Sequence, residues 1–197
     1  MTRLTPPDDL HSRQPLIIDV TPANFMHRFY TRDKDPVFFD QSDLGRFNSK
    51  TGSFGVLYAS KTPLGAFAET FLRKPGRTLI DLDFVQRKAY VRLKVASPLR
   101  FIQLAGNGLY RLGATAEIPH GPFPYDVPQV WSDALFAHPC QADGIAYNAR
   151  HDDSELCYAV FDRCASMIED AGRRLDLDAD WFWRLAEHYD VGIAPDA

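Results

Sequence analysis

The irregular order of strand-like and helix-like segments is the feature that most constrains the fold of this chain. Apolar, β-prone runs predict strands over 54–58, 89–95, 99–104, 143–147 and 157–161. Apolar residues at helical spacing predict helices over 64–72, 126–136 and 178–189. A doubly wound parallel sheet needs regular alternation of the two kinds, and the sequence contains no internal repeat. We therefore predict an α+β fold.

Two Thr-Pro pairs mark expected helix starts. Threonine can cap a helix, and proline needs no N–H at the first helical position. Thr21-Pro22 predicts a short helix that ends near His27. Thr62-Pro63 predicts the start of the helix that ends before Pro75.

The length of the chain favours one domain, because 197 residues suffice for a single hydrophobic core. Residues 1–20 contain several prolines and charges and are expected to form an arm laid onto a domain at 21–165. Residues 166–197 would form a C-terminal helical extension packed on the same domain. Within the domain, the strands at 89–95 and 99–104 are expected to pair in antiparallel fashion.

The overall charge argues against nucleic acid as the main partner. The formal net charge is −4, and the Lys and Arg residues form no continuous run. A bound anion must therefore be held by a few placed arginines, which favours a small ligand. The cysteines form no Cys-x-x-Cys pair, and residues 1–15 lack the apolar run of a signal peptide or membrane anchor. We expect a cytoplasmic protein with no membrane contact.

Three other patterns have simple structural interpretations. The run 106–111 begins like a dinucleotide fingerprint, but Arg111 replaces the third glycine, which favours a turn. The histidines never pair at i, i+4, and the carboxylates beside His151 have no distant partner, so no metal site is predicted. The tail helix has two apolar faces, one with Trp181, Leu185 and His188 and the other with Phe182, Ala186 and Tyr189. We expect these faces to pack in the core, and a surface that docks a partner is the alternative.

Two arginines beside aromatic residues are the first candidates for a binding site. Arg28 precedes Phe29, and Arg46 lies between Gly45 and Phe47. An arginine fork can hold a phosphate or pyrophosphate through paired hydrogen bonds, a neighbouring ring can stack on a base, and glycine lets the backbone approach a ligand. Taken alone, each arginine is more simply interpreted as a surface or salt-bridged residue.

Tyr58 and Glu69 are the next candidates. Tyr58 closes a predicted strand, and Glu69 lies on the following helix, one turn before Arg73. On a helical wheel Glu69 lies toward the flank of the apolar stripe, so the simpler interpretation is a solvated residue or an i, i+4 partner of Arg73. At the edge of a cleft, this carboxylate would instead stabilise the positive charge that grows on a ribose ring as its glycosidic bond breaks.

Several short motifs, taken in order over about residues 22–165, resemble the RES-domain family, which is named for its Arg, Glu and Ser residues. Their shared order is more specific than any one of them. The motifs are His27-Arg28-Phe29, Gly45-Arg46-Phe47-Asn48, Gly55-Val56-Leu57-Tyr58, Ala66-Phe67-Ala68-Glu69-Thr70, Gln129-Val130-Trp131, Asp143-Gly144-Ile145-Ala146-Tyr147 and Ala159-Val160-Phe161-Asp162. The resemblance implies a fold similar to ADP-ribosyltransferases, with small twisted β-sheets flanked by helices.

The resemblance also implies a toxin that cleaves the nicotinamide–ribose bond of NAD⁺ and is kept in check by a helix-turn-helix antitoxin. Arg28 and Arg46 would clamp the ligand, and Tyr58 would pack against its nicotinamide ribose end. Glu69 would be the catalytic carboxylate. NAD⁺ is then a substrate, no metal or prosthetic group is needed, and a homodimer is left open. The residues expected at the NAD⁺ site are Arg28, Phe29, Arg46, Phe47, Tyr58, Tyr147 and Asn148.

One position departs from the family pattern. Where the family has serine in a Tyr-x-Ser-Arg segment, this chain has Ala149, so the hydroxyl is missing. Asn148 and Ser154 are the candidates for a replacement donor. Two alternatives to NAD⁺ breakdown therefore stay open: a catalytically quiet nucleotide-binding or interaction module, and an enzyme that transfers ADP-ribose to a macromolecule.

Overall fold

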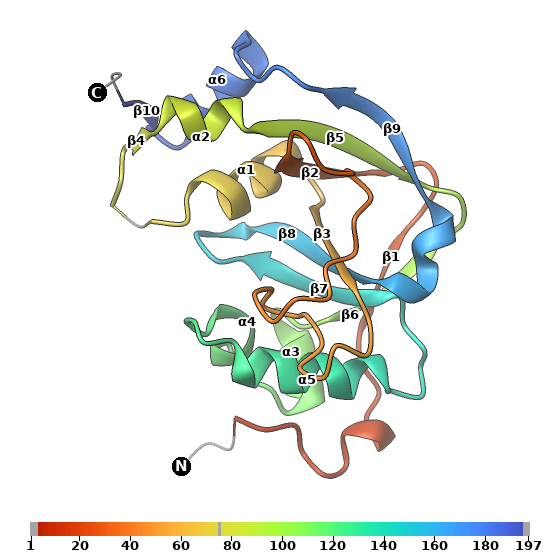
Figure 1. The fold of residues 1–197 in the computed structure, drawn as a ribbon. Coiled ribbons are helices and arrows are strands. Elements are labelled where there is room, and N and C mark those ends of the chain that lie inside the picture. The colour runs from red at the N-terminus through yellow and green to blue at the C-terminus, as the bar shows by residue number, and fades with distance from the viewer. Residues whose placement is uncertain (1–3, 75, 195–197) are drawn as a thin grey trace.

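Strands and helices follow one another irregularly in the computed structural model, which describes residues 4–74 and 76–194 (Figure 1). The strands are β1 (Ile17–Val20), β2 (Phe25–Thr31), β3 (Val56–Ser60), β4 (Leu79–Ile80), β5 (Lys88–Val95), β6 (Leu99–Gln103), β7 (Gly144–Ala149), β8 (Asp152–Phe161), β9 (Ile168–Arg174) and β10 (Gly192–Ile193). The helices are α1 (Pro63–Phe71), α2 (Leu82–Gln86), α3 (Asn107–Leu112), α4 (Glu117–His120), α5 (Asp126–Phe136) and α6 (Asp180–His188), with short 3₁₀ turns at Leu10–Ser12 and Asp162–Met167. The α+β prediction is confirmed.

Most of the strands form one mixed sheet in the order β1-β6-β7-β8-β3-β2-β5-β9. Neighbouring strands are antiparallel except β6 and β7, which are parallel. β2 pairs with β5 from Phe25 to Thr31, but with β3 only where His27 meets Ser60. The sheet is therefore almost divided between β2 and β3.

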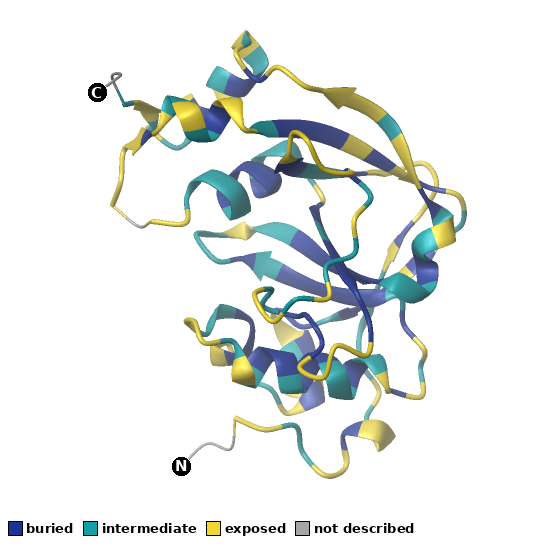
Figure 2. Cartoon of the chain, in the orientation of Figure 1, coloured by how far each residue is buried: buried dark blue, intermediate teal, exposed yellow. Residues whose placement is uncertain are grey.

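Three clusters of buried side chains pack on this sheet. Figure 2 shows the buried residues along the central strands and on the helices beside them. One cluster packs α3, α4 and α5 onto the strands around β7 and includes Trp131 and Phe161. A second consists almost entirely of strand residues such as Leu93 and Val160 on one face of the curved sheet. The third joins β2 and β5 to α1, α2 and α6 around Phe67. Helix α1 thus lies against the divide in the sheet.

The predicted helices with a complete apolar stripe are confirmed as α1, α5 and α6, and the predicted strands as β3, β5, β6, β7 and β8. The cap at the start of α1 is also present, because the Thr62 hydroxyl accepts a hydrogen bond from the first turn. In α6, Phe182 and Ala186 are buried and Trp181 stacks on Phe29. The tail helix therefore packs in the core, as predicted.

The helix predicted from Thr21 to His27 is wrong, because this segment enters strand β2. Thr21 begins a turn instead, in which the Asn24 N–H donates to the Thr21 carbonyl (2.9 Å). Proline at the second position of a turn produces the same local pattern as proline at a helix start. Pairing of Phe25–Thr31 with β5 then determines the strand.

The predicted antiparallel pairing of 89–95 with 99–104 is also wrong. β5 pairs with β2 and β9, and β6 pairs with β1 and β7. In the strand order, β5 and β6 lie in different halves of the sheet, so the short connection between them crosses from one half to the other. Strand β9, which the sequence did not indicate, occupies the free edge of β5.

The run 106–111, expected to be a turn, forms the start of helix α3. Its glycines have a packing role. A Cβ at Gly108 would lie 2.1 Å from the Gln103 carbonyl oxygen, so only glycine permits this close approach. Gly113 ends the helix in the left-handed conformation, at φ 72.

The predicted N-terminal arm and the predicted C-terminal extension each contribute a strand to the sheet. Within the arm expected at 1–20, Ile17–Val20 forms strand β1 beside β6. Within the extension at 166–197, β9 adds an edge strand and α6 covers α1. In the part of the chain that the structure describes, no helix is both long and apolar enough to span a membrane.

Gly144 gives a test of the packing between the central strands. A Cβ at this position would lie 2.3 Å from the Ala159 carbonyl oxygen on β8. We expect Gly144→Ala to lower the free energy of unfolding by about 1–3 kcal/mol, measured by urea denaturation, because the strands must move apart. Gly192→Ala is the control, since its nearest contact is 3.6 Å away. Equal stability of the two variants would contradict this packing.

Candidate active site

A cavity of about 460 Å³ lies where β2 and β3 separate. Its walls come from β2, β3, α1, the loop around Gly45 and the turn after β7. Glu69 is the one carboxylate among the described residues that line it. The basic lining residues are Arg28, Arg46, Arg73, Lys88 and Arg150. Positive charge is thus concentrated here although the chain as a whole carries a net charge of −4.

Helix α5 fixes the loop that carries Arg46. The Gln129 side-chain amide donates to the Gly45 carbonyl (3.0 Å), just before this arginine. The Ser132 hydroxyl donates to the Phe47 carbonyl (2.6 Å), just after it. Two neutral side chains of one helix therefore hold the backbone on both sides of Arg46.

The guanidinium of Arg46 lies inside the cavity beside Glu69, with 3.9 Å between Nη2 and Oε2. It also lies over the rings of Tyr147 (5.6 Å) and Tyr125 (5.9 Å). Burial disfavours its charge, but Glu69 and the tyrosines outweigh burial and raise the pKa of Arg46. Its Nε and Nη1 are buried and have no hydrogen-bond partner among the described residues. These donors suit an anion that enters the cavity.

The carboxylate of Glu69 is held from the opposite wall by two donors. Its Oε1 accepts from the Arg150 backbone N–H (2.9 Å), and its Oε2 accepts from the Tyr147 hydroxyl (3.4 Å). Arg73 instead donates to the Glu69 backbone carbonyl (3.1 Å). The simpler interpretation of Glu69 as an ion-pair partner of Arg73 therefore does not apply.

Tyr58 anchors the same loop from strand β3. Its hydroxyl donates to Asn48 Oδ1 (2.9 Å) and accepts from the Phe47 N–H (2.7 Å). The Asn48 amide in turn donates to Asp40 (2.9 Å), and a Cβ on Gly45 would lie 2.1 Å from Asn48 Oδ1. Burial raises the pKa of Tyr58, so its hydroxyl stays protonated and able to donate.

The charges on the β2 side of the cavity follow from burial. Burial lowers the pKa of Arg28 to about 10, which leaves it positive at neutral pH. Burial also lowers the pKa of His27 to about 4, so His27 is neutral there, with its Nδ1 2.6 Å from the Tyr90 hydroxyl. Burial, followed by repulsion from the positive charge of Arg73, lowers the pKa of Lys88.

Comparison with known proteins identifies the family. The RES domain profile matches residues 22–180, which is most of the chain. The chain belongs to the RES-domain family. Its fold is similar to the MbcT toxin in the crystal structure of the M. tuberculosis MbcT–MbcA toxin–antitoxin complex, with a TM-score of 0.71 and 13% sequence identity, over 94% of this chain and 100% of that chain. No curated protein gives a significant match to the sequence.

The structure brings the main predicted residues of this RES domain, Arg28, Arg46, Tyr58, Glu69 and Tyr147, to one cavity. Phe29 lines it too, whereas Phe47 is not among the described lining residues. The ring of Phe47 is fully buried against Tyr147 (4.8 Å), and the ring of Phe29 packs on Phe71 (5.1 Å). Neither ring is free to stack on a base. Asn148 is absent from the described cavity lining.

Ala149, which the sequence resemblance predicts to stand where the RES family has serine, is fully buried in the core at the end of β7. Neither proposed replacement donor reaches the cavity. Asn148 and Ser154 are both absent from the described lining, and the exposed Ser154 donates its hydroxyl to Asp152 (2.6 Å). The two donors to Glu69 come instead from Tyr147 and the Arg150 backbone. These two hydrogen bonds to the Glu69 carboxylate therefore do not require a hydroxyl at position 149.

Sequence reasoning missed several residues of the cavity. Tyr125 contributes a ring to Arg46 from the residue before α5, and Lys88 enters from the start of β5. Arg150 was not a candidate either, because the N–H that holds Glu69 belongs to the backbone, which no side-chain pattern reveals.

Two histidines near the cavity are neutral at pH 7. His151 lines it, and burial followed by Arg150 lowers the pKa of His151. Burial followed by Arg46 lowers the pKa of His120. In residues 4–74 and 76–194, no three His, Cys, Asp or Glu side chains gather closely enough to hold a metal ion.

Tyr58→Phe tests the anchor of the Arg46 loop. The variant keeps the ring but leaves the buried Phe47 N–H and Asn48 Oδ1 without this partner. We expect the free energy of unfolding to fall by about 1–3 kcal/mol in urea denaturation. Tyr110→Phe is the matched control, because Tyr110 is 89% exposed. A loss no larger than in the control would refute the anchoring role.

Proposed function

We propose that this RES-domain protein cleaves the nicotinamide–ribose bond of NAD⁺. One observation carries the proposal: the buried, unpartnered guanidinium nitrogens of Arg46 lie beside the fixed carboxylate of Glu69 in a basic cavity. The first group suits a pyrophosphate, and the second suits a cation that forms during the reaction. Membership of the RES family and the similarity to a toxin fold support it.

Arg28 and Arg46 are proposed to bind the pyrophosphate of NAD⁺. Both guanidinium groups line the cavity, and both remain charged at neutral pH. Among the described residues, Arg46 makes one ion pair, the 3.9 Å contact with Glu69. Arg28 makes none there, and its Nη1 donates to the Phe38 carbonyl (3.4 Å). Their charge is therefore available to a ligand, and a paired arginine–phosphate contact is strong in a partly desolvated site.

Glu69 is proposed to stabilise the transition state. As the bond between ribose C1′ and the nicotinamide nitrogen breaks, its electron pair leaves with the neutral nicotinamide, and positive charge develops on the ribose. A carboxylate fixed in advance by Arg150 N–H and the Tyr147 hydroxyl stabilises this charge without having to reorganise. Water or another acceptor then attacks C1′. Burial and then Glu69 raise the pKa of Tyr147, so the hydroxyl remains a donor.

A catalytically quiet NAD⁺-binding module is the second candidate, and Ala149 in place of the family serine is the observation that favours it. We prefer the enzyme because both donors to Glu69 are independent of a side chain at position 149. Transfer of ADP-ribose to a macromolecule would use the same bond cleavage with a different acceptor. Intact-mass analysis of acceptors separates transfer from breakdown.

In the cell, we propose that the protein is the toxin of a toxin–antitoxin pair and acts on cytoplasmic NAD⁺. The support is the RES family together with the similarity of its fold to MbcT, which comes from a toxin–antitoxin complex. The proposed partner is an antitoxin of the helix-turn-helix class. A partner that covers the cavity of Arg46 and Glu69 would keep NAD⁺ out.

Glu69→Gln tests the catalytic proposal. The amide keeps the size of the side chain but removes its negative charge, so we expect nicotinamide release from NAD⁺ to fall by about 10²–10³-fold. Nicotinamide is measured chromatographically with the purified protein. Glu169→Gln on exposed β9 is the matched control and should keep full activity.

The outcomes of this experiment separate the candidates. Equal nicotinamide release by wild type and Glu69→Gln would eliminate Glu69 as the catalytic residue. Wild-type protein that binds NAD⁺ tightly in calorimetry but releases no nicotinamide would select the quiet binding module.

Expression in growing cells tests the toxin proposal. We expect the wild-type protein to lower cellular NAD⁺ and slow growth, and Glu69→Gln to do neither at an equal protein level. Co-expression of a gene encoded beside this one should restore growth. NAD⁺ quantification and growth curves give the readout, and normal growth with normal NAD⁺ under wild-type expression would contradict a toxin.

A further inference from the structure

The residue just after helix α6, Tyr189, touches both elements that hold the carboxylate of Glu69. These elements are α1, which carries Glu69, and the turn between β7 and β8, which provides the Arg150 N–H. We propose that Tyr189 is a positioning residue for Glu69 and acts through Asp152 and this turn. The catalytic consequence rests on the proposed function, whereas the positioning itself can be tested without catalysis.

The first contact of Tyr189 fixes the turn. Its hydroxyl donates to Asp152 Oδ2 (2.7 Å), and Asp152 faces Ala149 across the turn as the pair that closes it. Arg150 lies inside this closed turn, one residue after Ala149. A constraint on Asp152 is therefore a constraint on the direction of the Arg150 N–H.

The carboxylate of Asp152 is itself held on both oxygens. Its Oδ1 accepts from the N–H (3.1 Å) and the hydroxyl (2.6 Å) of Ser154, while its Oδ2 accepts from Tyr189. Burial raises the pKa of Asp152, but the bonds from Ser154 and Tyr189 outweigh it and hold the pKa below its ordinary value. Asp152 is thus an ionised group with a fixed orientation at neutral pH.

The second contact of Tyr189 is with α1. Its ring stacks on Phe67, with centroids 5.7 Å apart and 6° between the planes, and its hydroxyl also lies 3.5 Å from the Leu64 carbonyl. Phe67 stands two residues before Glu69 on the same helix. One side chain therefore sets α1 and the turn relative to each other, and their separation determines the 2.9 Å bond from Arg150 N–H to Glu69.

A separate contact already joins the start of α1 to strand β8. The Thr62 hydroxyl at the start of α1 donates to Glu155 on β8, so the helix is attached there without Tyr189. Tyr189 adds the attachment at the turn, nearer to Glu69. Together with the buried side chains that already pack α1 into the core, the two attachments restrict how α1 can move relative to the turn.

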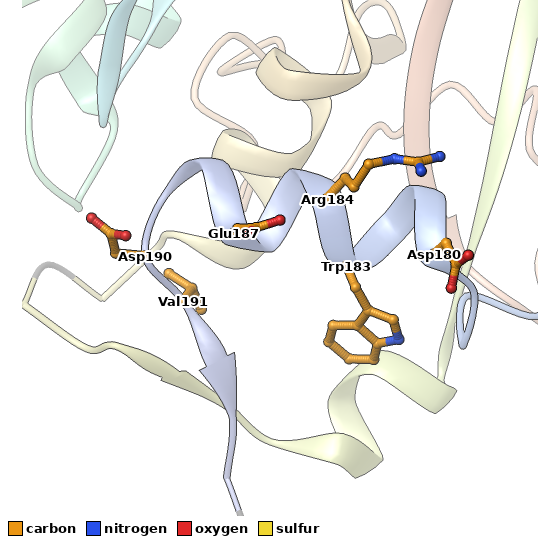
Figure 3. Close-up of a pocket in the computed structure, with 6 residues that line it drawn as sticks. All are labelled: Asp180, Trp183, Arg184, Glu187, Asp190 and Val191. Carbon is orange, nitrogen blue, oxygen red and sulfur yellow. The ribbon is translucent and has the colours of Figure 1, made fainter.

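The segment at the end of helix α6 thereby helps to position Glu69. The RES match ends at residue 180, where α6 begins, so this contribution lies beyond the matched region. Figure 3 shows the outward side of α6, where Trp183, Arg184 and Glu187 project from the helix around a shallow surface hollow. The inward residues Phe182 and Ala186 are buried against α1.

Tyr189→Phe tests the proposal, because it keeps the ring on Phe67 and removes only the hydroxyl. In the purified full chain without nucleotide, we expect the amide of Arg150 to exchange its hydrogen on the order of tenfold faster by NMR, since its acceptor is less well placed. With NAD⁺, we expect kcat to fall on the order of tenfold with KM little changed, because positioning affects the transition state. Tyr110→Phe is the matched control.

Each outcome decides one claim. Faster exchange confined to the turn, with core amides unchanged, supports the positioning role, and a further Asp152→Asn change should then add little. Unchanged Arg150 exchange, or an equal increase at all amides, overturns it. If the wild type releases no nicotinamide, the proposed function fails, and Arg150 exchange alone still decides whether Tyr189 positions Glu69.

Discussion

The separation of β2 from β3 is the constraint on which the site depends. After His27 meets Ser60, β2 continues beside β5 and β3 continues beside β8. The space between the diverging strands becomes the cavity, and the chain leaves β3 directly into α1, which carries Glu69. If β2 and β3 were paired along their whole length, this space would not open between them. The fold thus creates a cavity inside what is formally one sheet.

The electrostatics of the cavity depend on what holds its arginines. Neutral groups fix the Arg46 loop: the amide of Gln129, the hydroxyl of Ser132 and the hydroxyl of Tyr58. All three donate a hydrogen bond, to the Gly45 carbonyl, the Phe47 carbonyl and Asn48 Oδ1, which an ionised carboxylate cannot do, and none of them adds a negative charge beside the guanidinium. Because neutral donors are used, an acidic chain presents a strongly basic cavity in which Glu69 is the one negative group among the described lining residues.

The sequence predicted those elements whose apolar pattern is complete within one segment, such as α1 and α5. It failed at Thr21, because a Thr-Pro turn and a helix start look alike and only pairing with β5 distinguishes them. It missed β9, which is mostly exposed and polar. The candidate residues Arg46 and Glu69 were found through the order of family motifs, since periodicity favoured simpler roles. Burial of the Phe47 ring depends on long-range packing, which local patterns do not contain.

The backbone donor at Arg150 has a consequence for how this site can change. The N–H that binds Glu69 is present in every amino acid except proline, so the side chain at position 150 is released from that task. A substitution of the Arg150 side chain can change the charge or shape of the cavity while the backbone N–H still binds the carboxylate of Glu69. In this chain, the donor that holds Glu69 is therefore a backbone group that no side-chain pattern in the sequence records.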